Sequence, residues 1–251
     1  MRAIVKNFNY ITPKGENVTI ENSIILNAVE ATHNILDKFT EFDVEVFEIL
    51  GMRNLSSFIG EIFAASIVKG SNGFFKKNPH QDGYPDLLTM NETGHAIWKK
   101  LSTNLRDNSP FSPFENGGLE VKATCGSVPT PAQCQKRGLV KPDIGDTRIT
   151  FLTGYDWKAH HRETNNLLGV IWDFIDNVPR IVAVCYSNIL IEEDWGKIIK
   201  PKDGGGRTTS VSIMTREGVK KMYEGMLVIN DTDRRYVDFL NKYNKSDKLT
   251  Y

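Results

Sequence analysis

A run of strand-like segments in the middle of the chain constrains the fold more than any other feature of the sequence. Residues 119–124 alternate between apolar and polar side chains, which is the pattern of a strand with one buried face. Further segments of strand length, rich in apolar and β-branched residues, lie at 149–153, 167–174, 180–186 and 208–213. Strands pair with one another to satisfy their backbone hydrogen bonds, so these segments predict a central sheet.

Segments with helical spacing lie on both sides of this run of strands. Apolar side chains recur every three or four positions in 17–39 and in 56–68, the second with Ser56 or Ser57 as its expected N-cap. A further helix is expected at 215–223, capped by the threonine at its start. Helices before and after a run of strands predict an α/β (α+β) layer fold, with a mixed central sheet flanked by helices.

The length of 251 residues fits one domain that spans the whole chain, residues 1–251, with an N-terminal helical part at about 1–55. Hydrophobic residues make up 40% and charged residues 25%, close to the composition of ordinary globular proteins. No apolar run approaches the roughly 18–20 residues that span a bilayer, and the N-terminus lacks the apolar core of a signal peptide. We therefore expect a cytoplasmic protein without a membrane partner.

Cysteine spacing and motif content argue against a zinc site and against a nucleotide cofactor. Cys125, Cys134 and Cys185 are odd in number and lack the paired spacing of zinc ligands, so plain thiols are expected. The G-x-x-x-x-G-K-[ST] motif of P-loop NTPases is missing from the sequence, so an ATP-driven enzyme is not expected.

The formal net charge of +0 does not indicate a nucleic-acid partner, because DNA-binding domains usually carry a basic surface. The charge is nevertheless spread unevenly along the chain. Residues 21–48 are strongly acidic, whereas 136–162 and 197–221 are basic. A neutral total can therefore conceal a positively charged cleft.

The residues that point to chemistry are Pro85-Asp86 and the later segment Glu120-Val121-Lys122. On a strand, residues i and i+2 share a face, so Glu120 and Lys122 emerge side by side while the residue between them faces the core. An aspartate at the end of a neighbouring element completes a cluster of two carboxylates and one ammonium. Carboxylate oxygens can hold Mg²⁺, which polarises a scissile phosphate, and the lysine can orient or activate a water. Whether that lysine acts as a general base stays open. The pattern indicates phosphodiester hydrolysis.

These two motifs resemble those of the PD-(D/E)XK nuclease superfamily, with an apolar residue at x as the strand requires. Members often carry a further acidic residue on a helix before the PD motif, and Glu61 stands at that place, where a plain exposed helix charge is the alternative. The resemblance covers about residues 56–124, and the later strands are compatible with the family's αβββαβ core. It implies catalytic roles for Asp86, Glu120, Lys122 and Glu61, with Mg²⁺ held by Asp86 and Glu120.

Within this superfamily, the chain length and the lack of accessory domains are similar to those of type II restriction endonucleases. The resemblance implies a Mg²⁺-dependent, sequence-specific endonuclease that cuts double-stranded DNA as a homodimer. Other nucleases with this motif are alternatives: modification-dependent, nicking repair and junction-resolving enzymes. A DNA-binding protein without catalysis is the alternative in which the motif is a coincidence.

The segment after the ExK motif, residues 125–146, is the first candidate for DNA contacts. Glutamine can pair with adenine, and arginine or lysine with guanine, in the major groove. The residues of this kind are Gln133, Gln135, Lys136 and Arg137. A surface loop with ordinary charges is the alternative, and the sequence does not favour either.

A second candidate contains the side chains that can touch phosphates, Lys158, His160, His161 and Arg162. The alternative is a surface turn in which only Trp157 is anchored in the core. A third candidate follows the glycines at 204–206, where Arg207, Thr208 and Ser210 supply donors for a phosphate. A loop that orders on DNA is the preferred interpretation there, and a simple flexible connector is the alternative.

Overall fold

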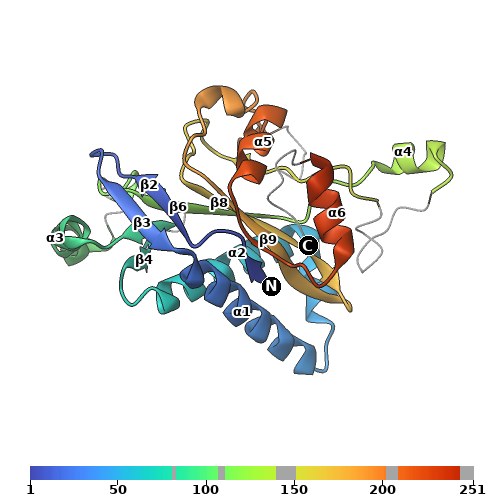
Figure 1. The fold of residues 1–251 in the computed structure, drawn as a ribbon, viewed down its shortest axis with the longest axis horizontal. Helices are drawn as coiled ribbons and strands as arrows, with labels where there is room; N and C mark the ends of the chain where they lie inside the picture. The colour runs from blue at the N-terminus through green and yellow to red at the C-terminus, as the bar shows by residue number, and fades with distance from the viewer. Residues whose placement is uncertain (81–82, 107–110, 140–150, 202–208, 244–251) are drawn as a thin grey trace.

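Within the described residues, seven strands form a mixed sheet at the centre of the computed structural model (Figure 1). The structure describes residues 1–80, 83–106, 111–139, 151–201 and 209–243. From one edge to the other, the strands are β1 (Arg2–Ala3), β11 (Met226–Ile229), β9 (Val178–Ser187), β8 (Leu167–Ile175), β6 (Gly118–Thr124), β5 (Leu87–Thr89) and β4 (Phe75–Lys77). β6 and β8 run parallel, and the other neighbouring strands are antiparallel.

Helices cover both faces of this sheet (Figure 1). The described helices are α1 (Asn22–Lys38), α2 (Val46–Gly70), α3 (Glu92–Leu101), α4 (Pro131–Lys136), α5 (Arg216–Glu224) and α6 (Arg234–Tyr243). On one face α1 and α2 pack over the sheet, and Phe63 of α2 shares a core with Trp172 of β8. On the other face α5 and α6 do so, and Met222 of α5 shares a second core with Ile171 of β8. The prediction of a mixed α/β fold with a mixed sheet flanked by helices is therefore confirmed.

Two-stranded sheets and short 3₁₀ segments lie outside the seven-stranded sheet. The hairpin of β2 (Asn7–Ile11) and β3 (Asn17–Glu21) precedes α1, and β7 (Lys158–Ala159) pairs with β10 (Ser212–Ile213) outside the main sheet. Short 3₁₀ segments lie at Phe39–Glu41, Ser102–Asn104 and Glu192–Asp194. The first 55 residues thus combine three strands with α1 and the first turns of α2.

Local sequence explains how the central strands and α5 are bounded. β8 and β9 are joined by Asp176-Asn177, both at positive φ (52° and 61°), as a two-residue hairpin turn requires. α5 begins after Thr215, whose side chain accepts a hydrogen bond from the backbone N–H of Gly218. The predicted segments 119–124, 167–174, 180–186 and 215–223 correspond to β6, β8, β9 and α5, so these four predictions are confirmed.

Two helix predictions have wrong boundaries. Residues 17–39 are not one helix, because Asn17–Glu21 pairs with β2 and the helix begins only at Asn22. The second helix begins at Val46 rather than near 56, with a break at Gly51, where φ is 63°. The predicted N-caps, Ser56 and Ser57, therefore lie inside α2. There Ser56 Oγ donates to the backbone oxygen of Met52 and accepts from the indole of Trp172.

Two strand predictions are also wrong in their described parts. Residues 151–153 form no strand, although the backbone of Thr153 bonds to Ser127. Of the predicted strand 208–213, only Ser212–Ile213 is a strand in the described part of the chain. The described apolar side chains of these segments, Phe151, Leu152, Val211 and Ile213, are only partly buried.

None of the described helices is long and apolar enough to cross a bilayer. Cys125, Cys134 and Cys185, all of which the structure describes, form no disulfide.

Candidate active site

Strand β6 places Glu120 and Lys122 beside each other. The strand is held in the middle of the sheet by parallel pairing with β8, and the Glu120 N–H donates to the Asn166 carbonyl at 3.0 Å. Val121, between the two, belongs to the core that α1 and α2 cover. The alternation expected from the sequence is therefore present at this strand.

Asp86 reaches the same place because it directly precedes β5, the antiparallel neighbour of β6. Its backbone N–H donates to Glu120 Oε2 at 3.2 Å, and its Oδ2 accepts from the Val121 N–H at 2.8 Å. Gly118 allows this close approach of β5 and β6, because a Cβ there would lie 1.8 Å from the Leu87 carbonyl oxygen. These two hydrogen bonds, one from the Asp86 backbone and one to its side chain, hold Asp86 next to Glu120.

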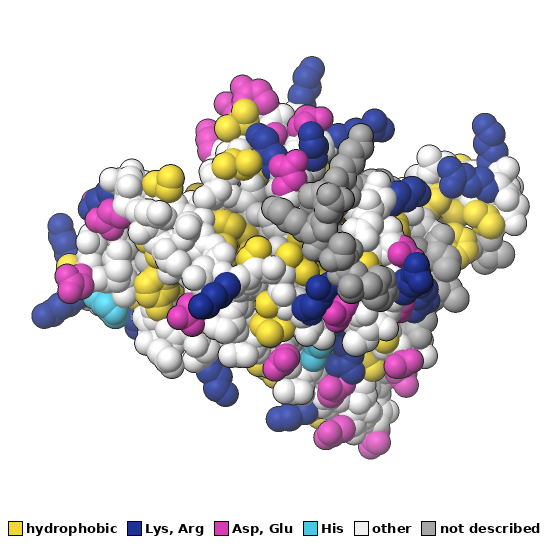
Figure 2. Space-filling view, viewed as in Figure 1, with side chains coloured by type: hydrophobic (Ala, Val, Ile, Leu, Met, Phe, Trp, Pro, Cys, Tyr) yellow, Lys and Arg dark blue, Asp and Glu magenta, His cyan; other side chains and the backbone are white. Residues whose placement is uncertain are grey.

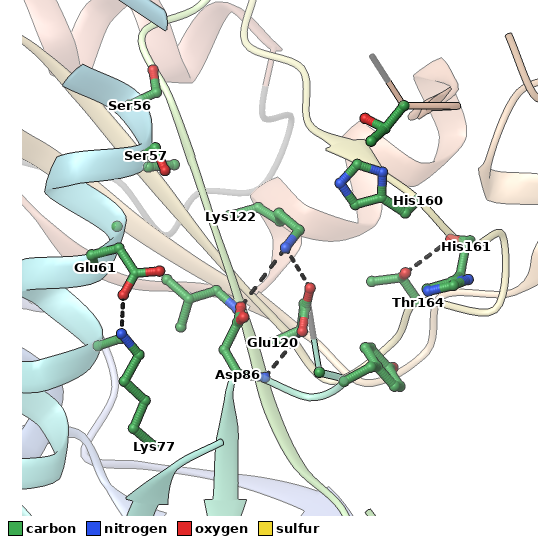
Figure 3. A pocket seen from close by; sticks show the side chains of 17 residues that line it. Ser56, Ser57, Glu61, Lys77, Asp86, Glu120, Lys122, His160, His161 and Thr164 are labelled. Atoms are coloured by element: carbon green, nitrogen blue, oxygen red, sulfur yellow. Dashed lines mark hydrogen bonds and ion pairs between the residues drawn. The ribbon is translucent and has the colours of Figure 1, made fainter. Parts of the chain in front are cut away.

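Lys122 joins these two carboxylates. Its Nζ forms an ion pair with Glu120 Oε1 and lies 3.7 Å from Asp86 Oδ2. Figure 3 shows the three side chains directed toward one another at the end of the strands. The structure therefore brings together the two carboxylates and the ammonium that the sequence pattern places side by side.

The buried charges of this cluster perturb one another. Glu120 is only 6% exposed, and burial raises its pKa to about 7; Asp86 adds to the rise, and Lys122 opposes it. Burial lowers the pKa of Lys122, but the carboxylates of Glu120 and Asp86 outweigh burial, so the pKa is raised. The lysine therefore stays an ammonium. Its single positive charge faces two acidic groups, Asp86 and Glu120, and cannot neutralise both when both are ionised.

Glu61 lies in the same pocket but outside the cluster. It projects from α2, and its carboxylate pairs with Lys77 at the end of β4 (Figure 3). Both side chains are more than half exposed. Glu61 is therefore near the site as the motif implies, with a lysine rather than Asp86 or Glu120 as its partner.

The cluster forms one wall of an open cavity of about 610 Å³, in the size range of ligand sites. α2 lines one side with Ser57 and Gly60, and the segment after β7 lines another. A second hollow of about 380 Å³ shares Glu61, Lys77 and Asp86 with the first. The two hollows together offer an extended surface on both sides of the Asp86 carboxylate.

The second group of predicted DNA contacts is divided by the structure. His160 and His161 line the large cavity, and the ring of His161 meets that of Tyr84 edge-on. Lys158 is exposed on β7 and does not line it. Arg162 pairs with Glu192 and donates to the Trp195 carbonyl, so it fastens its own loop. As the alternative interpretation required, Trp157 is buried.

The third group is only partly within the described residues. Arg207 and Thr208 lie outside them. Ser210 is half-buried, and its carbonyl oxygen, rather than its hydroxyl, contacts His160. Its neighbour Thr209 lines the large cavity.

The first group lies away from the cavity, on α4 or at its end. Figure 1 shows α4 at the far end of an extension from the body of the protein. Gln133, Gln135, Lys136 and Arg137 are all exposed, and none lines the cavity. The Gln133 side chain accepts from the Thr130 N–H in a capping box, so it serves the helix.

The cavity is also lined by Tyr84 and Lys77, which were not predicted from the sequence as site residues. Tyr84, directly before the PD motif, exchanges hydrogen bonds between its hydroxyl and the backbone of Asn165, which ties this loop to the start of β8. Lys77 pairs with Glu61. The position of Tyr84 next to the motif was a usable signal, whereas the role of Lys77 depends on the pairing of β4 with β5.

Comparison with protein-family models, with curated proteins and with solved structures finds no match to this chain.

The donor set of the cluster fits a hard divalent cation such as Mg²⁺. Among the described residues, no group of three or more His, Cys, Asp or Glu side chains is arranged to hold a metal. Mg²⁺ is commonly held by one or two carboxylates, with waters and substrate phosphates as its other ligands. Asp86 and Glu120 supply that pair, and the Lys122 ammonium lies against both carboxylates.

Proposed function

We propose that this chain is a Mg²⁺-dependent endonuclease that hydrolyses phosphodiester bonds of double-stranded DNA, in the manner of a type II restriction enzyme. The observation that carries the proposal is the convergence of Asp86, Glu120 and Lys122 on one wall of an open cavity.

Each of the three side chains has a distinct part in this chemistry. Asp86 and Glu120 hold the metal, which when bound polarises the scissile phosphate and lowers the pKa of a water. Lys122, an ammonium beside both carboxylates, donates a hydrogen bond to the attacking water or to a phosphate oxygen. Val121 fixes the orientation of Asp86 through its backbone N–H.

The order of elements around the site supports membership of the PD-(D/E)XK superfamily. Along the chain, α2, β4, β5, β6, α4 and β8 follow the αβββαβ order of that family, with α3 inserted between β5 and β6 and the short β7 placed before β8. Glu61 on α2, the PD pair before β5 and the ExK residues on β6 occupy the places that the motif implies. This support rests on order and position alone.

The surroundings of the site suit a polyanionic substrate. The two hollows carry the cationic side chain of Lys77 and the imidazoles of His80, His160 and His161 besides Lys122. In this proposal the exposed Lys136 and Arg137 at the end of α4 would contact phosphates of the duplex away from the cut. A second copy of the chain acting on the other strand completes the proposed homodimer.

Incubation of the purified chain with plasmid DNA and Mg²⁺ tests the proposal. Discrete linear fragments are expected, and EDTA should abolish them. Asp86→Ala, Glu120→Gln and Lys122→Ala should each reduce the rate by about 10²-fold or more, as removal of a group that stabilises the transition state usually does. Glu115→Gln is the matched control, because Glu115 is an exposed carboxylate that pairs with Lys14 outside the cavity.

Three outcomes separate this function from its rivals. Cleavage of methylated duplexes only indicates a modification-dependent enzyme, and cleavage of branched or nicked DNA indicates a repair or junction nuclease. DNA binding without cleavage, unchanged by Asp86→Ala, contradicts the proposal and favours a binding protein.

A further inference from the structure

His160 stands on a firmly held part of the cavity wall. It directly follows β7, in which Ala159 pairs with Ser212 of β10. The Met214 N–H donates to the Trp157 carbonyl at 3.0 Å, and the Trp157 side chain is buried in the core beneath. The backbone position of His160 is therefore set by the pairing of β7 with β10 and by the packing of Trp157 in the core.

The imidazole of His160 is oriented as well. Its Nδ1 lies 2.9 Å from the backbone oxygen of Ser210. A carbonyl oxygen can only accept, so Nδ1 must carry the hydrogen, and the neutral ring then has its lone pair on Nε2. The ring lines the same cavity as Asp86, Glu120 and Lys122, and Figure 3 shows it on the side where the Lys122 ammonium lies.

The other groups at the site are committed to different tasks. Both oxygens of Glu120 accept hydrogen bonds, from Lys122 and from the Asp86 N–H, and the ammonium of Lys122 has no lone pair to offer. Mg²⁺ prefers oxygen ligands, so the imidazole is not needed for the metal. His160 offers a nitrogen acceptor, Nε2, on this wall.

We propose that His160 is the general base of the reaction, with Nε2 accepting a proton from the water that attacks the phosphate. The inference rests on the proposed nuclease function. A lone pair of the water oxygen forms the new P–O bond as its proton passes to Nε2. The bond from phosphorus to the leaving oxygen breaks with its electron pair, and that oxygen takes a proton from solvent water. His160 later returns its proton to solvent.

The test compares His160→Ala with wild type in Mg²⁺-dependent plasmid cleavage, with and without added imidazole. A general base usually contributes about 10²–10⁴-fold, so a loss of that size in the turnover rate is expected, with DNA binding in Ca²⁺ unchanged. Free imidazole should restore part of the rate, which a purely structural role does not permit. His95→Ala is the matched control, because His95 is an exposed histidine on α3 that lines neither hollow.

Each outcome of this test bears on either the role of His160 or the proposed nuclease function. A His160→Ala rate close to wild type overturns the inference and leaves the nuclease standing. A lost rate that imidazole does not restore, together with a higher Mg²⁺ requirement, also overturns it, because His160 then acts on the metal. If wild type and Asp86→Ala are equally inactive on every DNA substrate, the proposed function fails, and the role of His160 fails with it. A thermal unfolding curve confirms that each variant is folded.

Discussion

Lys122 offsets only part of the negative charge that Asp86 and Glu120 bring to the end of β6. One ammonium faces two carboxylates, and burial already raises the pKa of Glu120. A divalent cation at this point stabilises the ionised form of both acids. Because such a cation binds the folded chain and not the unfolded one, it must also stabilise the fold.

Mg²⁺ is therefore expected to raise the thermal unfolding midpoint of the wild-type chain without any DNA. At a concentration of about 100 times Kd, the gain of roughly 2.7 kcal/mol corresponds to a shift of about 5–10 °C for a chain of this size. Asp86→Asn should lose the shift, because the amide keeps the acceptor for the Val121 N–H and removes the charge. Glu115→Gln should keep it. An equal shift in Asp86→Asn, measured by scanning fluorimetry, places the ion elsewhere.

His33 predicts a dependence of stability on pH that is unrelated to the active site. Its pKa is lowered to about 4, because burial disfavours the charged ring and Arg180 lies close by. Its Nε2 accepts from the Ile181 N–H at 2.9 Å, a bond that protonation breaks. The ordinary value of 6.5 applies in the unfolded chain, so between pH 6.5 and 4 the unfolded state binds more protons and the free energy of unfolding falls as pH falls.

His33→Gln should flatten that dependence, because the amide can accept the same hydrogen bond and does not titrate. The wild-type chain should lose about 1–3 kcal/mol across this window in urea unfolding, and the variant clearly less. His95→Gln, on the exposed side of α3, is the control and should behave as wild type. Identical slopes for His33→Gln and wild type contradict the assignment to His33.

At the scale of elements, the sequence predicted best where one pattern continued over a whole element. β6 alternates along its length and β8 is apolar except for Gly169 and Asp173, so both were found. The error at 17–39 arose because the strand Asn17–Glu21 runs into α1 without a turn. Ile20, which is buried from β3, sits at helical spacing from the apolar residues of α1 and imitates one more turn of helix.

The contact between β5 and β6 is the element-scale feature on which the site depends most. Gly118→Ala places a Cβ 1.8 Å from the backbone oxygen of Leu87, so the strands must move apart. We expect a loss of about 1–3 kcal/mol in the free energy of unfolding and a weaker Mg²⁺ effect, because Asp86 moves away from Glu120.

Gly60→Ala is the matched control for that substitution. Gly60 lies in the helical part of α2, and a Cβ there meets only the Ala123 Cβ at an ordinary 3.6 Å. Alanine in a helix is favoured over glycine by about 0.5–1 kcal/mol, so this variant should be slightly more stable than wild type. Chemical denaturation of both variants is the measurement, and an unchanged midpoint for Gly118→Ala shows that β5 and β6 tolerate the separation.

At the scale of the whole molecule, the neutral total charge hides an uneven surface. Figure 2 shows acidic side chains gathered at the lower end of the view, over the turn between α1 and α2, where Asp43, Glu45 and Glu48 are exposed. The sequence predicted this acidic segment and the pairing of Glu120 with Lys122 along one strand. That Asp86 would join them was expected from the two motifs, although the contact itself depends on the pairing of β5 with β6. The position of α4 away from the cavity was not predicted, because it depends on how distant parts of the chain pack. A duplex is expected to approach the cavity side rather than the acidic end.

One carboxylate cluster cuts one strand at a time, so a concerted cut through both strands needs two copies of the site. In the proposed homodimer each copy supplies one cluster to one strand. A dimer of one wild-type and one Asp86→Asn chain should therefore nick a plasmid instead of opening it. Wild type mixed and re-equilibrated with excess Asp86→Asn is expected to yield nicked circles on a gel, whereas the same excess of Glu115→Gln should yield linear DNA. Linear product that merely falls in proportion to the wild-type fraction, without nicked circles, indicates that the copies cut independently, and a single species of monomer mass in sedimentation would support the same conclusion.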